Sequence, residues 1–155
     1  MYEIDQKISS FKIPTDDGTF NLDEKPCKYL VIFFFPKANT FGCTKEAKEF
    51  TEIIKEFENL NTLIIGISKD NPIKLKKFRK KYDLKCLLGS DENSEICENF
   101  GVWVEKSMYG RKYMGIERST FLIDPEGFIA KEWRKVKVPN HAQEVYDFLK
   151  SLSKT

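Results

Sequence analysis

The sequence has a single histidine and no closely spaced pair of cysteines. Its four cysteines, Cys27, Cys43, Cys86 and Cys97, are scattered over the chain. Their spacing matches neither the C-x-x-C pair of a thiol–disulfide exchange site nor the paired ligands of a zinc site. We therefore expect no bound metal.

A long apolar segment is also missing. The longest apolar run, residues 29–35, holds seven residues, whereas a helix needs about 20 residues to cross a bilayer. The first residues, Met1 to Asp5, have neither the basic flank nor the apolar stretch of a signal peptide. We therefore expect a cytoplasmic protein that does not enter a membrane.

Neither sign of charge dominates the chain. Its 26 Lys and Arg residues stand against 24 Asp and Glu residues, giving a formal net charge of +2. This balance gives no general reason to expect nucleic acid or an anionic membrane as a partner. One basic stretch, residues 74–81, fills the positions left free by a helical apolar stripe, and we interpret it as a solvated helix face.

The 155 residues suit one domain, residues 1–155, with enough apolar content for a real core. Strand and helix patterns alternate and then give a hairpin and a closing helix, which predicts an α/β thioredoxin-like fold. Its central mixed sheet would be flanked by helices and preceded by a β-hairpin. The expected strands are residues 30–35, 63–67, 86–88, 118–123 and 128–133, after a hairpin at 11–22; the expected helices follow Cys43, Asn71, Glu95 and Asn140.

Cys43 stands between the apolar strand at 30–35 and a long amphipathic helix expected to extend to Leu60. The positive end of a helix dipole can lower a thiol pKa from about 8.5 to between about 3.5 and 7.5, and the thiolate is the nucleophilic form. The placement predicts a cysteine-based redox enzyme. A Cys–His hydrolase would have to use the lone His141, which we interpret instead as part of a helix start.

Two motifs resemble a known family. Pro36, Thr40 and Cys43 match the P-x-x-x-T-x-x-C signature of the peroxiredoxins, and residues 109–116 followed by 118–124 resemble their bacterioferritin comigratory protein (PrxQ) subfamily. The resemblance covers nearly the whole chain. It implies a thiol-dependent peroxidase that reduces hydrogen peroxide and organic hydroperoxides and needs no metal or organic cofactor.

The resemblance also implies roles for particular residues. Cys43 would attack the peroxide and become a sulfenic acid, and Arg118 would stabilise the negative charge beside its sulfur. Thr40 would direct its hydroxyl at the peroxide, and Pro36 would shield the sulfur from water. The structural alternatives are a surface ion pair for Arg118, a helix cap for Thr40 and a strand end for Pro36. Glu46 would either orient groups around the pocket or serve as an acidic residue in the first helical turn.

The chain departs from the subfamily where a second, resolving cysteine is expected. Lys48 and Arg79 occupy the two usual positions, and Cys86 and Cys97 look like small buried residues. We therefore predict a one-cysteine cycle, in which thioredoxin or another thiol reduces Cys43. The resemblance to the subfamily implies a monomer. The alternative is a two-cysteine cycle that reaches Cys97 or Cys86 by local unfolding.

Phe41 replaces the proline that is usual in the active-site loop of the subfamily, and this change could favour organic hydroperoxides. Two other classes of protein remain open. A thioredoxin-type oxidoreductase would need the missing C-x-x-C pair. A silent thioredoxin-like binding module would leave the thiol of Cys43 titrating near about 8.5.

Overall fold

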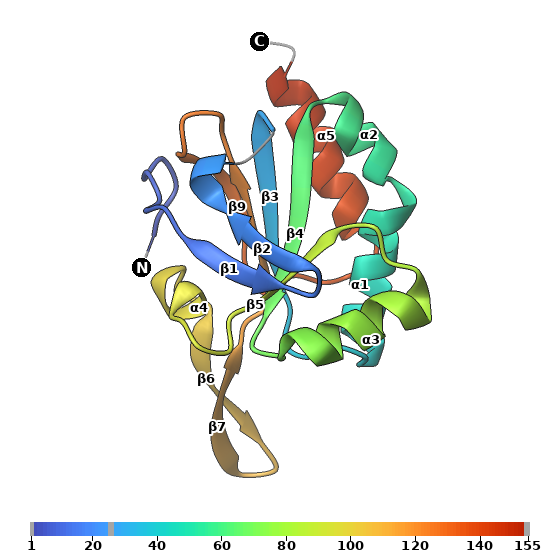
Figure 1. Ribbon diagram of the computed structural model, residues 1–155. Helices are drawn as coiled ribbons and strands as arrows, with labels where there is room; N and C mark the ends of the chain where they lie inside the picture. Colours follow the sequence, from blue (N-terminus) through green and yellow to red (C-terminus); the bar gives the residue numbers. More distant parts are fainter. Residues whose placement is uncertain (1, 25–26, 154–155) are drawn as a thin grey trace.

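A mixed sheet of seven strands forms the centre of the fold (Figure 1). The structure is a computed structural model that describes residues 2–24 and 27–153, so the ends of the predicted 1–155 domain lie outside the described residues. Within the described chain the strand order is β2-β1-β5-β4-β3-β8-β9. These strands are β1 (Lys12–Thr15), β2 (Gly18–Asn21), β3 (Tyr29–Phe34), β4 (Thr62–Ser68), β5 (Leu87–Ser90), β8 (Ser119–Ile123) and β9 (Ile129–Trp133).

The pairing makes the sheet mixed, as the sequence predicts. β3, β4 and β5 run parallel, while β8 and β9 form an antiparallel hairpin that pairs with β3. The β1–β2 hairpin joins the other side through a contact of Thr15 with Gly89. The N-terminal hairpin and the hairpin after Arg118 are therefore both confirmed.

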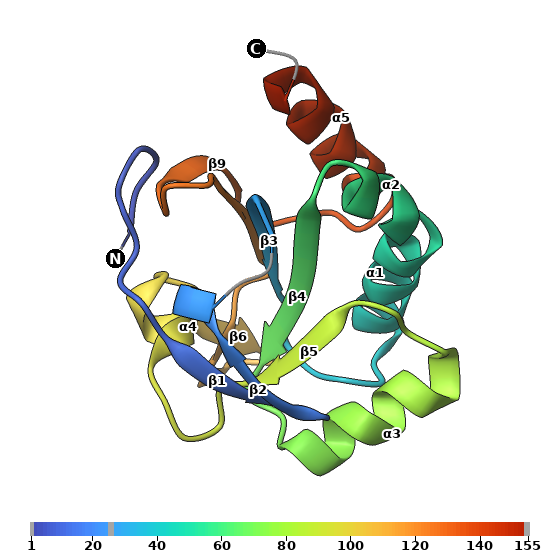
Figure 2. The same cartoon turned by 45° about the horizontal axis from the view of Figure 1, so that its top comes forward.

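Helices cover both faces of the sheet, unequally (Figure 2). Four of them share one face and its core, whereas the short α4 packs with the N-terminal segment against the other. None of the helices in the described chain is both long and apolar enough to cross a membrane. The helices are α1 (Phe41–Glu52), α2 (Ile54–Asn59), α3 (Pro72–Tyr82) and α5 (His141–Ser153) on the first face, α4 (Ile96–Asn99) on the second, and a 3-10 turn, η1 (Leu22–Glu24).

The apolar run in β3 reflects this two-sided cover. Val31 and Phe33 belong to the core under α1 and α5, while Ile32 and Phe34 belong to the core under α4. A strand that is buried on both faces needs apolar residues at every position rather than at alternate ones. Gly66 on β4 makes room for the ring of Phe33, because a Cβ there would lie 2.5 Å from the ring's Cζ.

The helix after β3 differs from the prediction at its start and in its middle. It begins at Phe41, ahead of Cys43, and it breaks at Ile53, whose φ of −115° and ψ of 18° leave the helical range. Thr51, Ile53 and Ile54 form a run rich in β-branched side chains, which lose side-chain freedom in a helix and weaken it there. The predicted single helix is thus α1 followed by α2.

A two-stranded ribbon, β6 (Trp103–Met108) and β7 (Arg111–Ile116), was not predicted. It projects from the body of the molecule (Figure 1). Its turn uses Tyr109 and Gly110, both in the left-handed region with φ of 52° and 79°. Positive φ at both central residues is the geometry of tight hairpin turns, but tyrosine is not a usual residue for it.

The start of α3 confirms the prediction, whereas its basic face needs one correction. The side chain of Asn71 caps the helix by accepting from the amide of Lys74. Most of the lysines on α3 are exposed. Arg79, however, is turned inward, forms an ion pair with Asp16 and donates to the carbonyl of Cys86, so it ties the β1–β2 turn to β5.

Helix α5 begins where the sequence predicts, but Asn140 is not a usual cap. It has a φ of 64°, in the left-handed region, whereas a capping residue is normally extended. Asparagine tolerates this conformation better than most residues, which explains its presence at the turn into α5.

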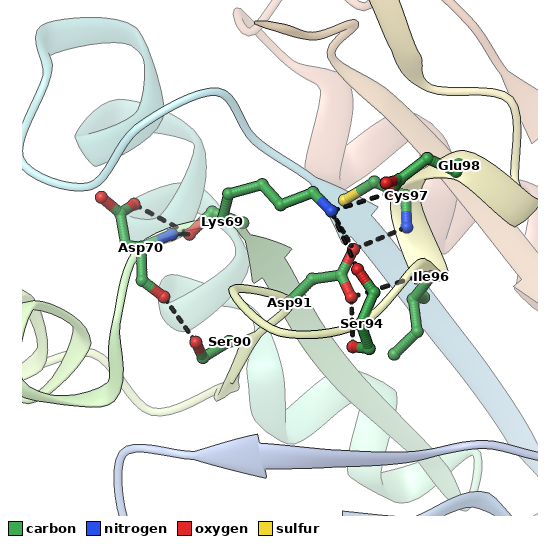
Figure 3. Close-up of polar contacts among 9 residues, drawn as sticks. Lys69, Asp70, Ser90, Asp91, Ser94, Ile96, Cys97 and Glu98 are labelled. Carbon is green, nitrogen blue, oxygen red and sulfur yellow. Dashed lines mark hydrogen bonds and ion pairs between the residues drawn. The ribbon is translucent and has the colours of Figure 1, made fainter.

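A buried carboxylate holds α4 against the sheet (Figure 3). Asp91 follows β5 and accepts hydrogen bonds from the amides of Ile96 and Cys97, over 3.1 and 2.8 Å. Burial raises the pKa of Asp91, but hydrogen bonds, first that of Ser94, outweigh burial and leave the pKa below its usual value. The Nζ atom of Lys69 lies 3.2 Å from the same carboxylate. The cluster stays charged and fixes α4 at the carboxyl ends of β4 and β5.

Candidate active site

Cys43 lies just beyond the carboxyl end of β3, in the first turn of α1. The half-buried Pro36 separates the strand from the loop that leads into the helix. The thiol side chain is 1% exposed and packs in the same core as Ala47 and Phe50. The structure therefore places the cysteine between strand and helix, as the sequence predicts.

Arg118 reaches the sulfur of Cys43 from a distant part of the chain. Strand β8 pairs with β3 in antiparallel register, Ser119 opposite Phe34, so the residue before β8 lies at the end of β3. The Nη2 atom of Arg118 lies 3.3 Å from the Sγ atom of Cys43. Gly42 allows this approach, because a Cβ at that position would lie 3.1 Å from Nη2.

The other side of the same guanidinium binds Glu46. Nη1 of Arg118 donates to Oε1 of Glu46 over 2.8 Å, and Glu46 is almost fully buried. The residue lies beyond the first turn of α1, which begins at Phe41, so the first-turn interpretation of Glu46 is wrong. The orienting interpretation fits this contact.

Burial and charge act in opposite directions on this pair. Burial raises the pKa of Glu46 to about 7, even though Arg118 acts to lower it. For Arg118, burial lowers the pKa, but the charges of Glu46 and Cys43 outweigh burial and raise it overall. The Oε2 atom of Glu46 is buried without a hydrogen-bond partner. Protonation of Glu46 removes a negative charge from this buried position, which is the form that burial favours.

Thr40 stands at the N-cap position of α1, but its hydroxyl does not cap the helix. The backbone is extended, with φ of −89° and ψ of 160°, as at a normal cap. The hydroxyl instead donates to the carbonyl of Lys37 over 2.8 Å. The helix-cap interpretation of the side chain is therefore wrong, because this local turn takes the hydroxyl away from the amides of the first helical turn.

Side chains from outside the signature hold the loop before Cys43. Asp70 accepts from the amide of Ala38 over 2.7 Å and from the hydroxyl of Ser68 over 2.8 Å. Asn39 has a φ of 65°, and its side chain accepts from the hydroxyl of Tyr82 over 2.9 Å. Sequence reasoning missed these contacts, because no local pattern links the loop to the end of β4 or to α3.

Lys106 on β6 is a second cation near the thiol that the sequence did not indicate. It is half-buried between two exposed neighbours and interacts electrostatically with Arg118 and Cys43. Burial lowers the pKa of Lys106, and Arg118 lowers it further, whereas Cys43 acts to raise it. The unpredicted ribbon thus brings a positive charge to the site.

A groove of about 520 Å³ runs beside the start of α1. We call it the α1 groove; Thr40, Phe41, Thr44 and Lys48 line it together with Tyr82 of α3. The Phe41 ring is 87% exposed at its rim. The groove therefore offers an apolar edge close to Cys43.

Of the other cysteines, only Cys86 lies in the same core as Cys43. Cys86 shares the core of Cys43 and is buried, and burial raises the pKa of its thiol to about 12. Cys97 belongs to the core on the opposite face of the sheet, and burial raises its pKa as well. Both are confirmed as small buried residues. Cys27 is half-buried near the start of β3, at the opposite end of that strand from Cys43.

His141 serves the structure at the start of α5, as predicted. Its ring nitrogens contact the hydroxyl of Thr120 over 2.7 Å and the carboxylate of Glu144 over 3.0 Å. Burial lowers its pKa, although Glu144 acts to raise it. Across residues 2–24 and 27–153, no cluster of His, Cys, Asp and Glu is arranged to hold a metal ion.

Comparisons with known proteins agree with this arrangement. Residues 4–132 match the model of the AhpC/TSA family. The chain is 45% identical over 152 residues to peroxiredoxin Bcp of Bacillus subtilis, covering 97% of each chain. It is 40% identical over 141 residues to peroxiredoxin Bcp of Escherichia coli K12, covering 90% of each.

Solved structures show the same fold. A mutant PrxQ of Xylella fastidiosa superposes with a TM-score of 0.93 at 34% identity, covering 99% of this chain and 98% of that one. The bacterioferritin comigratory protein of Xanthomonas campestris, studied for its alkyl peroxide reduction activity, superposes with a TM-score of 0.87 at 38% identity, covering 92% of each chain. The thioredoxin-like fold predicted from the sequence is confirmed.

Proposed function

Because the chain belongs to the AhpC/TSA family and is a thiol peroxidase of the Bcp (PrxQ) type, we propose that Cys43 is its peroxide-reactive residue. The observation that carries the assignment is the 3.3 Å contact between Nη2 of Arg118 and Sγ of Cys43. A guanidinium beside the sulfur stabilises the thiolate, which is the nucleophile.

The reaction is a displacement at a peroxide oxygen. The thiolate of Cys43 attacks one oxygen, an S–O bond forms, and the O–O bond breaks. The leaving hydroxide or alkoxide takes a proton and departs as water or alcohol, and Cys43 becomes a sulfenic acid. Arg118 stabilises the negative charge as it moves from sulfur to the leaving oxygen.

Thr40 and Pro36 complete the proposed site. The hydroxyl of Thr40 donates its proton to the carbonyl of Lys37, so its lone pairs face outward from that bond and can accept from a peroxide O–H. The amides of Gly42 and Cys43 lie at the positive end of α1, where they favour the developing anion. Pro36, half-buried before the loop, limits the access of water to the sulfur.

Regeneration follows a one-cysteine cycle with an external thiol. Cys97 packs in the opposite core, and Cys86 is fully buried with its carbonyl held by Arg79. A disulfide with Cys43 needs Cα atoms within about 7 Å of each other, and bringing a buried thiol to Cys43 needs local unfolding. Thioredoxin or another thiol would therefore reduce the sulfenic acid directly. A monomeric state and a cytoplasmic location stay predictions from the sequence.

Reduction by an external thiol requires the start of α1 to open. The side chain of Cys43 is 1% exposed, so a reductant cannot reach a sulfenic acid held in the same position. The loop before Cys43 is anchored mainly by the contacts of Ala38 and Asn39. Opening of the first turn of α1, with this loop still anchored, is a local event that leaves the sheet intact.

Peroxide consumption by wild type and by Cys43→Ser, with dithiothreitol and with thioredoxin, tests the proposal. We expect rapid turnover for the wild type and none for the variant, with no intramolecular disulfide by mass spectrometry. A triple variant, Cys27→Ser, Cys86→Ala and Cys97→Ala, should retain turnover with dithiothreitol. A disulfide from Cys43 to one of these residues would establish a two-cysteine cycle instead.

A further inference from the structure

A second cavity, of about 250 Å³, lies beside the active-site loop. Its wall on one side is the loop itself, at Ala38 and Asn39, and the buried ring of Phe78 forms part of its floor. We call it the lysine pocket, because four lysines line it: Lys37, Lys74, Lys77 and Lys81.

The lining of this pocket has an excess of positive charge, with four lysines and one carboxylate. Lys37, Lys74 and Lys77 form no ion pair with any carboxylate of residues 2–24 and 27–153, unlike Lys69 and Arg118. The one acidic residue in the lining, Asp70, already accepts from the amide of Ala38 and the hydroxyl of Ser68. Four ammonium groups and one carboxylate leave an excess of positive charge around one small cavity, which favours a ligand with more than one negative charge.

The pocket lies within reach of the reactive thiol. Asn39 lines both the lysine pocket and the α1 groove, so the two cavities meet at the loop before Cys43. Four residues of chain from Asn39 to Cys43 span at most about 14 Å, and the helical turn at the start of α1 makes the distance shorter. A thiol ligand about three residues long spans about 10 Å, enough to bridge most of this distance.

We propose that the lysine pocket binds the carboxylates of a small anionic thiol, which is the reductant of the Cys43 sulfenic acid. This inference rests on the proposed one-cysteine cycle. The thiol attacks the sulfur of the sulfenic acid, the S–O bond breaks, and water leaves as a mixed disulfide forms. A second molecule of the same thiol then attacks the mixed disulfide, which releases the free disulfide and restores the Cys43 thiol.

The charge of the reductant can be tested while its thiol is kept the same. Reduced glutathione, with two carboxylates, is compared with its diethyl ester, in which both are masked, and 2-mercaptoethanol serves as a reference reductant. We expect wild type to react with glutathione at least about fivefold faster than with the ester at low salt. The advantage should shrink as added salt shortens the screening length from about 30 Å at 0.01 M to about 3 Å at 1 M.

Two double variants that remove the same charge distinguish the effect of the pocket lysines from that of other lysines on α3. Lys74→Gln/Lys77→Gln removes two lysines of the pocket, whereas Lys76→Gln/Lys80→Gln removes two from a different cavity, which lies beside Arg79. We expect only the first to abolish the preference for glutathione over its ester. It should also weaken binding of S-methylglutathione, which has no reactive thiol, as measured by calorimetry.

The outcomes distinguish this inference from the proposed function. No turnover with any thiol, 2-mercaptoethanol included, would overturn the peroxidase assignment of Cys43 and the inference with it. Turnover with 2-mercaptoethanol but equal rates for glutathione and its ester would overturn only the proposal that the lysine pocket binds the reductant. So would an equal loss of the preference in both double variants, which would mean that only the overall charge of α3 matters.

Discussion

The guanidinium of Arg118 bridges the sulfur of Cys43 and the carboxyl group of Glu46, through Nη2 at 3.3 Å and Nη1 at 2.8 Å. A planar guanidinium that is fixed at one nitrogen also has its other nitrogen fixed in direction. We therefore expect Glu46 to act on the site by orienting Arg118 towards the sulfur. The geometry of the site therefore depends on all three residues together more than on any two of them.

Replacing Arg118 by lysine should slow the reaction with peroxide by roughly 100-fold to 1000-fold, the range for loss of one preorganised donor. Lysine keeps a charge but cannot contact Cys43 and Glu46 at once through a rigid fork. Stopped-flow measurement of Cys43 oxidation by hydrogen peroxide gives the rate. Arg111→Lys, on the exposed part of β7, is the control and should match wild type. An Arg118→Lys rate within about twofold of wild type would contradict the role.

Glu46→Gln should change how stability depends on pH. The pKa of Glu46 rises from 4.5 to about 7 on folding, so between these values the folded state holds a proton that the unfolded state has lost. Wild-type stability should therefore fall as pH rises from about 4.5 to about 7, by a few kcal/mol at most. The variant should lack this slope. Urea unfolding at several pH values measures it, with the exposed Glu52→Gln as control; identical slopes in all three proteins would refute the prediction.

Lys106→Met should slow oxidation of Cys43 by about threefold to tenfold, because one positive charge is lost near the sulfur. The methionine keeps the apolar stem that packs over Gly115. Lys112→Met, at an exposed position on the same ribbon, is the matched control. The same kinetics with hydrogen peroxide measure both variants. Equal rates for the two would show that Lys106 does not act on the thiol.

Phe41→Pro should lower the preference for organic hydroperoxides. Proline is favoured at the first position of a helix, so stability should rise by about 0.5 kcal/mol or stay unchanged. The exposed ring at the rim of the α1 groove is lost, so the rate with cumene hydroperoxide should fall about threefold relative to hydrogen peroxide. In Phe41→Leu, which keeps an apolar side chain, this relative rate should fall less. If Phe41→Pro leaves the ratio of the rates with cumene hydroperoxide and hydrogen peroxide unchanged, the hypothesis is wrong.

Local patterns predicted the scaffold around Cys43 well. The apolar run of β3, the capped and proline-led start of α3, and the turn between β8 and β9 each have a signal within a few residues of sequence. The ribbon of β6 and β7 has none, because most of its residues lie outside a core and alternate weakly between apolar and polar. Its turn depends on a left-handed backbone conformation at Tyr109, which the residue type does not predict.

The site itself was predictable only where a motif marks it. Cys43 was singled out by its place between strand and helix, and Thr40, Pro36 and Arg118 were predicted as site residues through the resemblance; the hydroxyl of Thr40 has a different partner from the one expected. The partnership of Glu46 with Arg118, and the proximity of Lys106, depend on strand pairing between segments far apart in the chain. Only the fold brings such residues together, so charge and spacing along the sequence could not reveal them.

The division of the buried thiols between two cores gives the protein a pair of internal reporters. Cys86 lies under the helices of one face and Cys97 under α4 on the other, and both are shielded from solvent. A thiol reagent can modify each one only when its own side of the sheet opens. In a Cys43→Ser protein, comparing the labelling rate of Cys86 with that of Cys97 would show which side of the sheet opens more often. It would also show whether the two sides open together.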